Sequence, residues 1–166
     1  MANSFSVAAL DFSSDRSSFE SGVEPLDRYF RTQVSQDIKR RVTACFVASD
    51  MKGKIAGYYT LASASVLLAD LPEAVIKKLP RYPSVPAVRM GRLAVDQAFK
   101  GKGLGASLLA DALRRAVTSE IAAYAFIVDA KDEDAASFYA HHGFIALTDQ
   151  PLHMFIALAT VKDLIR

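Results

Sequence analysis

Apolar residues recur with two different spacings along the 166-residue chain. Short runs rich in β-branched and aromatic side chains predict strands at 5–12, 43–49, 55–67 and 87–96. The first of these strands is expected at a sheet edge. A turn at 50–53 separates the second strand from the third, and this pattern predicts a β-hairpin.

Apolar residues four positions apart, from Leu26 to Ile38, predict a helix that begins at Pro25. An apolar stripe over 104–120 predicts a longer amphipathic helix, and serines and aspartates at 13–21 predict a short capped one. The rest of the chain predicts a proline-rich loop with one short helix at 72–79, a strand covered on both faces at 122–130, a helix at 132–142 that Gly143 ends, and strands at 144–148 and 153–159. This order of elements predicts a mixed α/β fold in one domain, residues 1–166.

The composition is that of an ordinary globular protein, with 51% hydrophobic and 23% charged residues, which excludes a disordered chain. The longest apolar run, Ile121 to Val128, is far shorter than the roughly 20 residues that span a bilayer. No signal-peptide pattern is visible. One cysteine and three poorly spaced histidines exclude a disulfide framework and a zinc site, so we expect a metal-free cytoplasmic protein.

Charge is unevenly distributed although the net charge is only +2. Residues 28–41 carry five basic side chains and one acid, and 77–92 carry five basic side chains and no acid, whereas acids gather at 129–136. Clustered lysine and arginine can mark a polyanion partner. A solvated helix face and a mobile loop would produce the same pattern, so charge alone leaves both interpretations open.

Three glycines, Gly101, Gly103 and Gly105, lie between a predicted strand and the long helix, flanked by Lys100 and Lys102. Glycines let backbone N–H groups approach an anion, and a helix start adds unpaired donors and partial positive charge, so the pattern predicts a pyrophosphate site. The spacing matches neither the P-loop nor G-x-G-x-x-G. A plain strand–helix turn is the alternative interpretation.

The segment RLAVDQAFKGKGLGASLLADAL resembles the acetyl-CoA-binding segment of GNAT acetyltransferases, although lysine stands at the usual Gln/Arg position, and FYAHHGF resembles the closing motif of that family. The resemblance implies the GNAT fold, a mixed, mostly antiparallel twisted sheet flanked by helices with splayed central strands, and acetyl-CoA as the acetyl donor without a metal. The cofactor-binding residues that it implies are Leu93, Ala94, Val95, Lys100, Gly101, Lys102, Gly103, Leu104, Gly105 and Ala106.

The segments at 23–47, 57–66, 79–96 and 128–144 resemble, in order, the GNAT toxins of bacterial toxin–antitoxin systems, which acetylate the α-amino group of aminoacyl-tRNA and stop translation. This resemblance implies a homodimer, an aminoacyl-tRNA substrate, no membrane partner, and a small antitoxin of the ribbon-helix-helix DNA-binding class. Phosphate contacts come from basic side chains. The candidates are Arg31, Lys39, Arg40, Arg41, Lys77, Lys78, Arg81, Arg89 and Arg92.

With this resemblance, Tyr139 becomes the candidate general acid, since a phenol near pKa 10 can protonate a thiolate whose acid has a pKa near 8.5. The alternative is a buried aromatic with a satisfied hydroxyl. A backbone N–H near Val95 is the expected oxyanion partner. No motif marks a general base. The adjacent His141 and His142 are not expected to form one, because neighbouring residues point apart on a helix. A site without a general base fits an α-amino group, ordinarily near pKa 7.7–8.0, better than a lysine side chain near 10.4, because more of the α-amino group is already neutral at neutral pH.

Two other functions compete with the toxin hypothesis. A GNAT enzyme could act on a protein N-terminus or a small amine, and tight salt-dependent tRNA binding would distinguish it. A non-enzymatic module could keep the fold without the chemistry, and acetyl-CoA turnover that depends on Tyr139 would exclude it.

Overall fold

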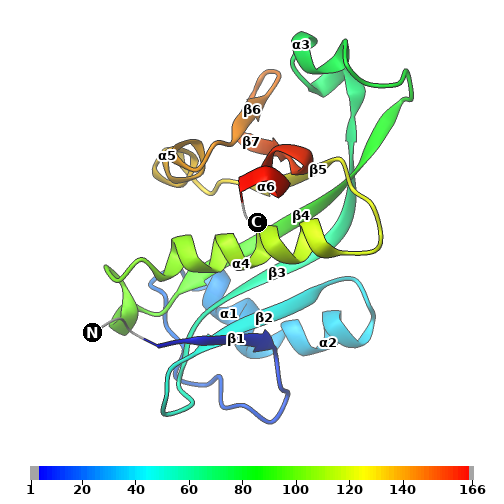
Figure 1. The fold of residues 1–166 in the computed structure, drawn as a ribbon. Coiled ribbons are helices and arrows are strands. Elements are labelled where there is room, and N and C mark those ends of the chain that lie inside the picture. Colours follow the sequence, from blue (N-terminus) through cyan, green and yellow to red (C-terminus); the bar gives the residue numbers. More distant parts are fainter. Residues whose placement is uncertain (1–3, 165–166) are drawn as a thin grey trace. The chain divides into compact units, whose positions relative to one another are not determined.

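The computed structural model describes residues 4–164 (Figure 1). Their strands follow the order β1-β2-β3-β4-β5-β7-β6 in one seven-stranded sheet. The β4–β5 pair is parallel, and the β1–β2, β2–β3, β5–β7 and β6–β7 pairs are antiparallel. The predicted mixed α/β class with a mostly antiparallel sheet is confirmed. By packing, the chain divides into unit 1, which runs to Ala62 and resumes over Gly91–Ala112, and unit 2, which comprises Ser63–Met90 and the chain from Leu113 onward.

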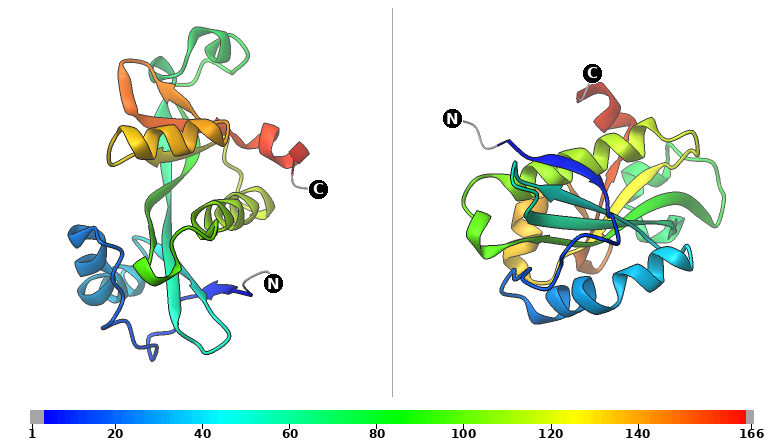
Figure 2. Two further views of the ribbon diagram at one scale, coloured as in Figure 1. Left: turned by 90° about the vertical axis from the view of Figure 1, so that its left-hand side faces the viewer. Right: turned by 90° about the horizontal axis from the view of Figure 1, so that it is seen from below.

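Unit 1 contains the N-terminal edge strand, the predicted hairpin and two short helices. Figure 2 shows the hairpin strands between these helices and the beginning of the long helix. The elements are β1 (Ser6–Ala9), α1 (Glu24–Thr32), α2 (Val34–Lys39), β2 (Ala44–Ser49), the first part of β3 (Ile55–Leu67), the end of β4 (Ser84–Val95), the 3-10 helix η2 (Gln97–Phe99) and the start of α4 (Leu104–Thr118).

Unit 2 holds the other ends of β3, β4 and α4. Its own elements are the 3-10 helix η1 (Leu68–Asp70), α3 (Glu73–Ile76), β5 (Ala125–Asp129), α5 (Glu133–His141), β6 (Ile145–Leu147), β7 (Gln150–Ala157) and α6 (Leu158–Leu164). The β4–β5 ladder ends at the Met90–Val128 pair although β4 continues to Val95. The ladder thus covers all of β5 except its last residue, Asp129.

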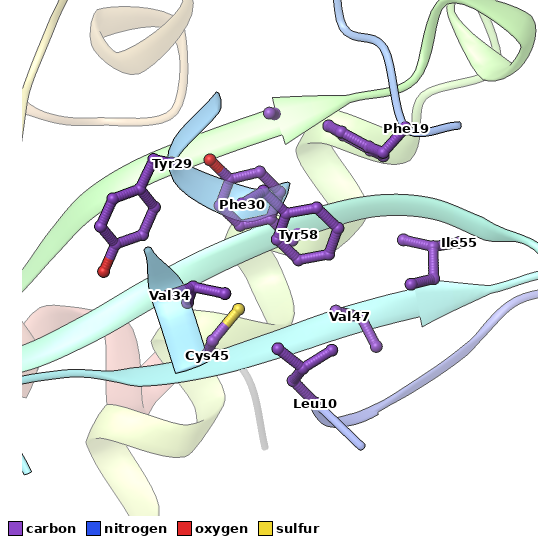
Figure 3. Packing of buried hydrophobic residues seen from close by; sticks show 10 residues of the cluster. Leu10, Phe19, Tyr29, Phe30, Val34, Cys45, Val47, Ile55 and Tyr58 are labelled. Carbon is purple, nitrogen blue, oxygen red and sulfur yellow. The ribbon is translucent and has the colours of Figure 1, made fainter. Parts of the chain in front are cut away.

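The core of unit 1 is built on aromatic rings (Figure 3). Phe30 of α1 stacks on Tyr58 of β3 with ring centroids 4.3 Å apart, and Phe19 packs edge-on against both rings. The Tyr58 hydroxyl donates to the Leu26 carbonyl at 2.7 Å. These contacts attach α1 to the sheet, because aromatic burial and a satisfied hydroxyl favour the same arrangement.

The core of unit 2 is mostly aliphatic. Four successive residues of β5, Ala125 to Val128, are buried, which confirms the predicted strand with both faces covered. The cluster on one face of this strand consists of Val66, Leu71, Val85, Ala87, Ala125, Ile127, Leu147 and Phe155.

Two sequence predictions need correction, and one helix was missed. The helix predicted at 13–21 is wrong, because Asp11 accepts from the backbone N–H of Ser13 and Asp15 from that of Ser17, each at 2.9 Å, and such local bonds favour turns over helix. The helix from Pro25 is two helices, interrupted at Gln33. Helix α6 was not predicted.

Candidate active site

The predicted anion site lies in unit 1 between η2 and α4, and we call residues 100–105 the glycine turn. Gly101 and Gly103 have φ angles of +80° and +76°, which side chains other than glycine rarely allow. A Cβ atom built on either residue would meet no atom within 4 Å. The backbone of the turn is therefore open to a ligand.

The first turn of α4 adds backbone donors to this opening. The Gly103 carbonyl accepts the first bond of the helical series, from Ser107 N at 3.1 Å. The N–H groups of Leu104, Gly105 and Ala106 precede this bond and so have no helical acceptor. Three free donors and the positive end of a helix suit a phosphate group.

The predicted cofactor strand, Leu93 to Val95, precedes the turn. Ala94 is buried, and its two neighbours are half-buried. Strand β3 passes it closely at Gly57, where a Cβ would lie 2.9 Å from the Ala94 carbonyl oxygen and 2.8 Å from Leu108 of α4. Any side chain at Gly57 would push β3 away from this strand end and from α4, so this glycine fixes their spacing.

Residues remote in sequence hold the start of the glycine turn. Lys100 Nζ donates to the Ser21 carbonyl at 2.6 Å, and the Asp27 carboxylate accepts from Ser21 N and Oγ at 3.0 and 2.6 Å. The buried Asp96 carboxylate accepts from Glu20 N at 3.0 Å. Lys100 thus fixes the turn to the N-terminal segment, a structural contact that the glycine pattern does not indicate.

The other lysine of the turn, Lys102, is exposed, and its ammonium lies 5.6 Å from the centroid of the Phe99 ring. Of the two lysines in the pattern, Lys102 is therefore the one better placed to meet a solvent-side anion.

Tyr139 lies in unit 2 near the end of α5. Asp132 caps the start of this helix by accepting from Ala135 N at 2.8 Å, and Gly143 follows its end with a φ of +95°. The Tyr139 carbonyl accepts from Phe144 N at 3.1 Å, so the turn after the helix is also fixed.

The Tyr139 side chain is only 6% exposed and packs between Phe138 and Phe144, with ring centroids 5.3 and 5.5 Å away. Among residues 4–164 its hydroxyl has no hydrogen-bond partner. The hydroxyls of Tyr29 and Tyr58, by contrast, each donate at 2.7 Å, to a carboxylate and to a carbonyl. The expected alternative for Tyr139, a buried ring with a satisfied hydroxyl, does not describe this side chain.

Burial, with a smaller contribution from the negative charge of Asp129, raises the pKa of Tyr139 to about 12. The prediction assumed an ordinary phenol near pKa 10, and that assumption is wrong. The higher pKa keeps the proton on Tyr139 throughout the neutral range. It also makes proton transfer to a thiolate less favourable than transfer from an ordinary phenol would be.

Two of the predicted phosphate-binding arginines in unit 1 already have contacts within the protein. Arg31 donates from Nε and Nη2 to the Phe19 carbonyl at 3.1 and 2.9 Å, and Nη2 lies 3.9 Å from Asp27. The Arg92 guanidinium stacks on the Tyr29 ring, 3.4 Å from its centroid.

Three other predicted phosphate-binding residues of unit 1 are consecutive in the sequence. Lys39, Arg40 and Arg41 are exposed at the end of α2, and Arg41 has a left-handed φ of +60°. Lys39 Nζ lies 5.3 Å from the ring centroid of Phe12, itself 45% exposed.

The basic residues of unit 2 fall into two places. Lys77, Lys78 and Arg81 are exposed after α3, where Lys77 and Arg81 line a cavity of about 560 Å³ together with Tyr82, which is 63% exposed. Tyr82 is not among the predicted site residues, although its position as an aromatic side chain within a basic run could have indicated it. Arg89 lies elsewhere, with Nε 3.8 Å from an Asp129 oxygen.

Comparison with known proteins identifies the family. Residues 15–156 match the family model described as acetyltransferase (GNAT) domain. The chain belongs to the GNAT acetyltransferases. Over 153 residues it is 37% identical to a protein of Mycobacterium tuberculosis named tRNA-acetylating toxin, with 91% of this chain and 90% of that protein covered.

Solved GNAT structures share the fold over almost the whole chain. AtaT complexed with acetyl-methionyl-tRNAfMet is 27% identical, with a TM-score of 0.90 over 98% of this chain and all of that one. AtaTR bound with AcCoA is 26% identical, with a TM-score of 0.85 and full coverage of both chains. The predicted GNAT fold and acetyltransferase class are confirmed.

Within residues 4–164, no three His, Cys, Asp or Glu side chains group closely enough to hold a metal ion. In the same part of the chain, no helix has the length and apolar character needed to cross a bilayer.

Proposed function

We propose that this GNAT enzyme transfers the acetyl group of acetyl-CoA to the α-amino group of an aminoacyl-tRNA, and that it acts as a toxin by blocking translation. The observation that carries the proposal is the 37% identity, over nine-tenths of both chains, to a tRNA-acetylating toxin. The likeness to AtaT, whose structure contains an acetylated aminoacyl-tRNA, supports the same substrate class.

Acetyl-CoA is the donor, and the glycine turn has the properties its pyrophosphate requires. The open backbone at Gly101 and Gly103 and the free N–H groups of the first turn of α4 would bind the phosphates. Lys102 would add a positive charge, while Lys100 keeps the turn in place. By resemblance to the family, the backbone of Leu93 to Val95 would pair with the pantetheine arm.

The reaction joins the amine nitrogen to the thioester carbon and breaks the carbon–sulfur bond. A backbone N–H near Val95 would stabilise the oxyanion, since a donor fixed by the fold needs no reorganisation. Tyr139 would hydrogen-bond the leaving thiolate and supply its proton. The unpartnered hydroxyl supports this role, because nothing in the described residues competes for it.

Exposed cations supply the tRNA surface in this proposal. Lys39, Arg40 and Arg41 form one group in unit 1, and Lys77, Lys78 and Arg81 form another in unit 2. Phosphate contacts from such residues bind through charge rather than sequence. Tyr82 would stack on an unpaired base, as exposed aromatics do in single-stranded RNA recognition.

The proposal extends to the biology of the enzyme. We expect one catalytic domain, a homodimer, a cognate antitoxin of the ribbon-helix-helix class, and action in the cytoplasm, where charged tRNA and ribosomes are found. The resemblance to GNAT toxins supports these expectations.

A labelling experiment tests the activity. The protein is incubated with radiolabelled acetyl-CoA and total charged tRNA, the RNA is digested, and labelled aminoacyl adenosines are identified. Deacylated tRNA is the control and should stay unlabelled. Label confined to protein N-termini or small amines would replace tRNA by the alternative substrate, and no turnover at all would leave a binding module.

A further inference from the structure

Unit 2 contains a histidine–carboxylate pair that no sequence motif marks. The β5–β7 register places Asp129 opposite His153, and His153 Nδ1 lies 2.7 Å from Asp129 Oδ1. An ionised carboxylate only accepts hydrogen bonds, so Nδ1 carries the hydrogen. In the neutral ring this leaves a lone pair on Nε2, the arrangement of a histidine base.

The pair lines a cavity of about 200 Å³. The second oxygen of Asp129 lies 3.8 Å from Arg89 Nε, so this carboxylate is near a positive charge as well as the histidine ring. The side chains of His153 and Asp129 are 52% and 41% exposed. A small amine can therefore reach the ring from solvent. The charged groups that line the cavity with His153 are Asp129 of β5, Arg89 of β4 and Asp70 of η1.

The same carboxylate acts on the proposed general acid. Tyr139 belongs to the helix that follows β5, and the charge of Asp129 contributes to the raised pKa of Tyr139. Asp129 is therefore within electrostatic reach of Tyr139 in unit 2. The Asp129 carboxylate thus contacts the His153 ring and also favours the protonated form of Tyr139.

We propose that His153 is the general base of the acetyl transfer and that Asp129 is the positioning residue that orients its ring. This inference rests on the proposed function and changes the expectation of a site without a base. The neutral fraction of an α-amino group, ordinarily near pKa 7.7–8.0, attacks the thioester and must then lose one proton to become an amide, so a base that accepts this proton increases the rate.

The protons balance over one turnover. As the carbon–nitrogen bond forms and the carbon–sulfur bond breaks, one amine proton passes to His153 Nε2 and the Tyr139 proton passes to the CoA sulfur. His153 then returns its proton to water and Tyr139 regains one, so the products are the amide and the CoA thiol.

The experiment compares His153→Ala with His141→Ala, which changes an exposed histidine of α5 in the same unit. At pH 7, His153→Ala should lower the rate of aminoacyl-tRNA acetylation about 100-fold, as expected for loss of a general base. The deficit should shrink as pH rises, because hydroxide replaces the base. Added imidazole should restore part of the rate, whereas His141→Ala should match the parent with and without imidazole.

Asp129→Asn tests the positioning role. It should lower the rate about tenfold, and imidazole should not restore it, since the ring is still present. Equal thermal melting of all variants and the parent shows that folding is intact, and the exposed positions of both side chains favour this result.

Two results would overturn the inference: a parent-like rate and pH profile in His153→Ala, or a deficit that is constant with pH and unaffected by imidazole. Failure of the proposed function is a separate result, because it is read from the labelled product of the parent. The ratio of variant to parent rates is then measured on whichever amine that product identifies.

Discussion

Tyr58 in unit 1 and Tyr139 in unit 2 are the same residue type in similar apolar surroundings. Both are buried among aromatic rings, and burial raises the pKa of each. The Tyr58 hydroxyl donates to the Leu26 carbonyl, whereas the Tyr139 hydroxyl has no partner within residues 4–164. The difference teaches that the available partners, rather than burial or residue type, separate a structural tyrosine from one open to chemistry.

Two glycine-containing turns of unit 1 show the same difference. In the hairpin turn, Gly53 has a φ of +83°, but the Asp50 side chain accepts from Lys52 N and Lys54 N at 2.9 Å each. That turn satisfies its own donors. The glycine turn is followed by helix N–H groups without helical acceptors, so only it has donors to offer an anion.

Replacing Tyr58 and Tyr139 by phenylalanine, one at a time, tests whether only the tyrosine without a hydrogen-bond partner takes part in the reaction. Tyr139→Phe should lower the acetyl-transfer rate by about 10²–10⁴-fold with unchanged acetyl-CoA affinity, because it removes the proton donor alone. Tyr58→Phe should leave the rate unchanged and cost about 1 kcal/mol of stability. Single-turnover kinetics and denaturant unfolding measure the two effects. A Tyr139→Phe enzyme as fast as the parent would make Tyr139 a packing residue.

The two turns are compared by adding the same side chain to each. Gly103→Glu should weaken acetyl-CoA binding by at least about 100-fold, or about 2.7 kcal/mol, because it puts a negative charge where the pyrophosphate would bind. Gly53→Glu imposes the same left-handed strain, about 1–2 kcal/mol, in equally open space and should bind normally. Calorimetric titration decides between them. Equal affinities in both variants would move the cofactor site elsewhere.

The exposed cations at the end of α2 and in the hairpin turn can also be compared, by their contribution to tRNA binding. Reversing Lys39, Arg40 and Arg41 to glutamate should weaken tRNA binding about tenfold or more and flatten its dependence on salt, with acetyl-CoA affinity retained. Reversing Lys52 in the hairpin turn is the control and should leave both affinities unchanged. The α2 variant should lose about 0.3–1 kcal/mol of stability per charge, so melting is measured beside binding. An unchanged dependence of tRNA binding on salt would exclude the α2 cations as phosphate contacts and leave Lys77, Lys78 and Arg81 as the candidates.

The smallest expected effect concerns stability at high pH. The pKa of Tyr139 is about 12 in the folded protein and near 10 in the unfolded chain. Between these values the unfolded chain has lost the proton that the folded protein keeps. The contribution of Tyr139 is therefore complete below pH 10 and declines by at most about 1.4 kcal/mol per pH unit up to pH 12. Unfolding of the parent and of Tyr139→Phe, compared from pH 8 to 11, should diverge only above pH 10.

Elements determined by local pattern were predictable. The hairpin around 50–53, the long amphipathic helix and the helix that Gly143 ends depend on residues within a few positions of each other. The helix at 13–21 failed for an equally local reason, because the capping side chains of Asp11 and Asp15 form turns of their own.

Contacts between distant residues were not predictable from a single sequence. His153 meets Asp129 only through the β5–β7 register, 24 residues away, and Lys100 meets Ser21 across 79 residues. The glycine turn could be recognised because its chemistry lies in consecutive residues. The His153–Asp129 pair and the Lys100–Ser21 contact could not be recognised, since no periodicity in the sequence connects the two residues of either pair.

The bond from Lys100 to Ser21 has a consequence for how the protein is made. The segment at Glu20 and Ser21 leaves the ribosome first, yet its partners at Asp96, Gln97 and Lys100 follow nearly 80 residues later. We expect nascent chains that end before α4 to be inert, because the helix donors that follow the glycine turn are missing. Activity would therefore arise only after most of the chain has been synthesised.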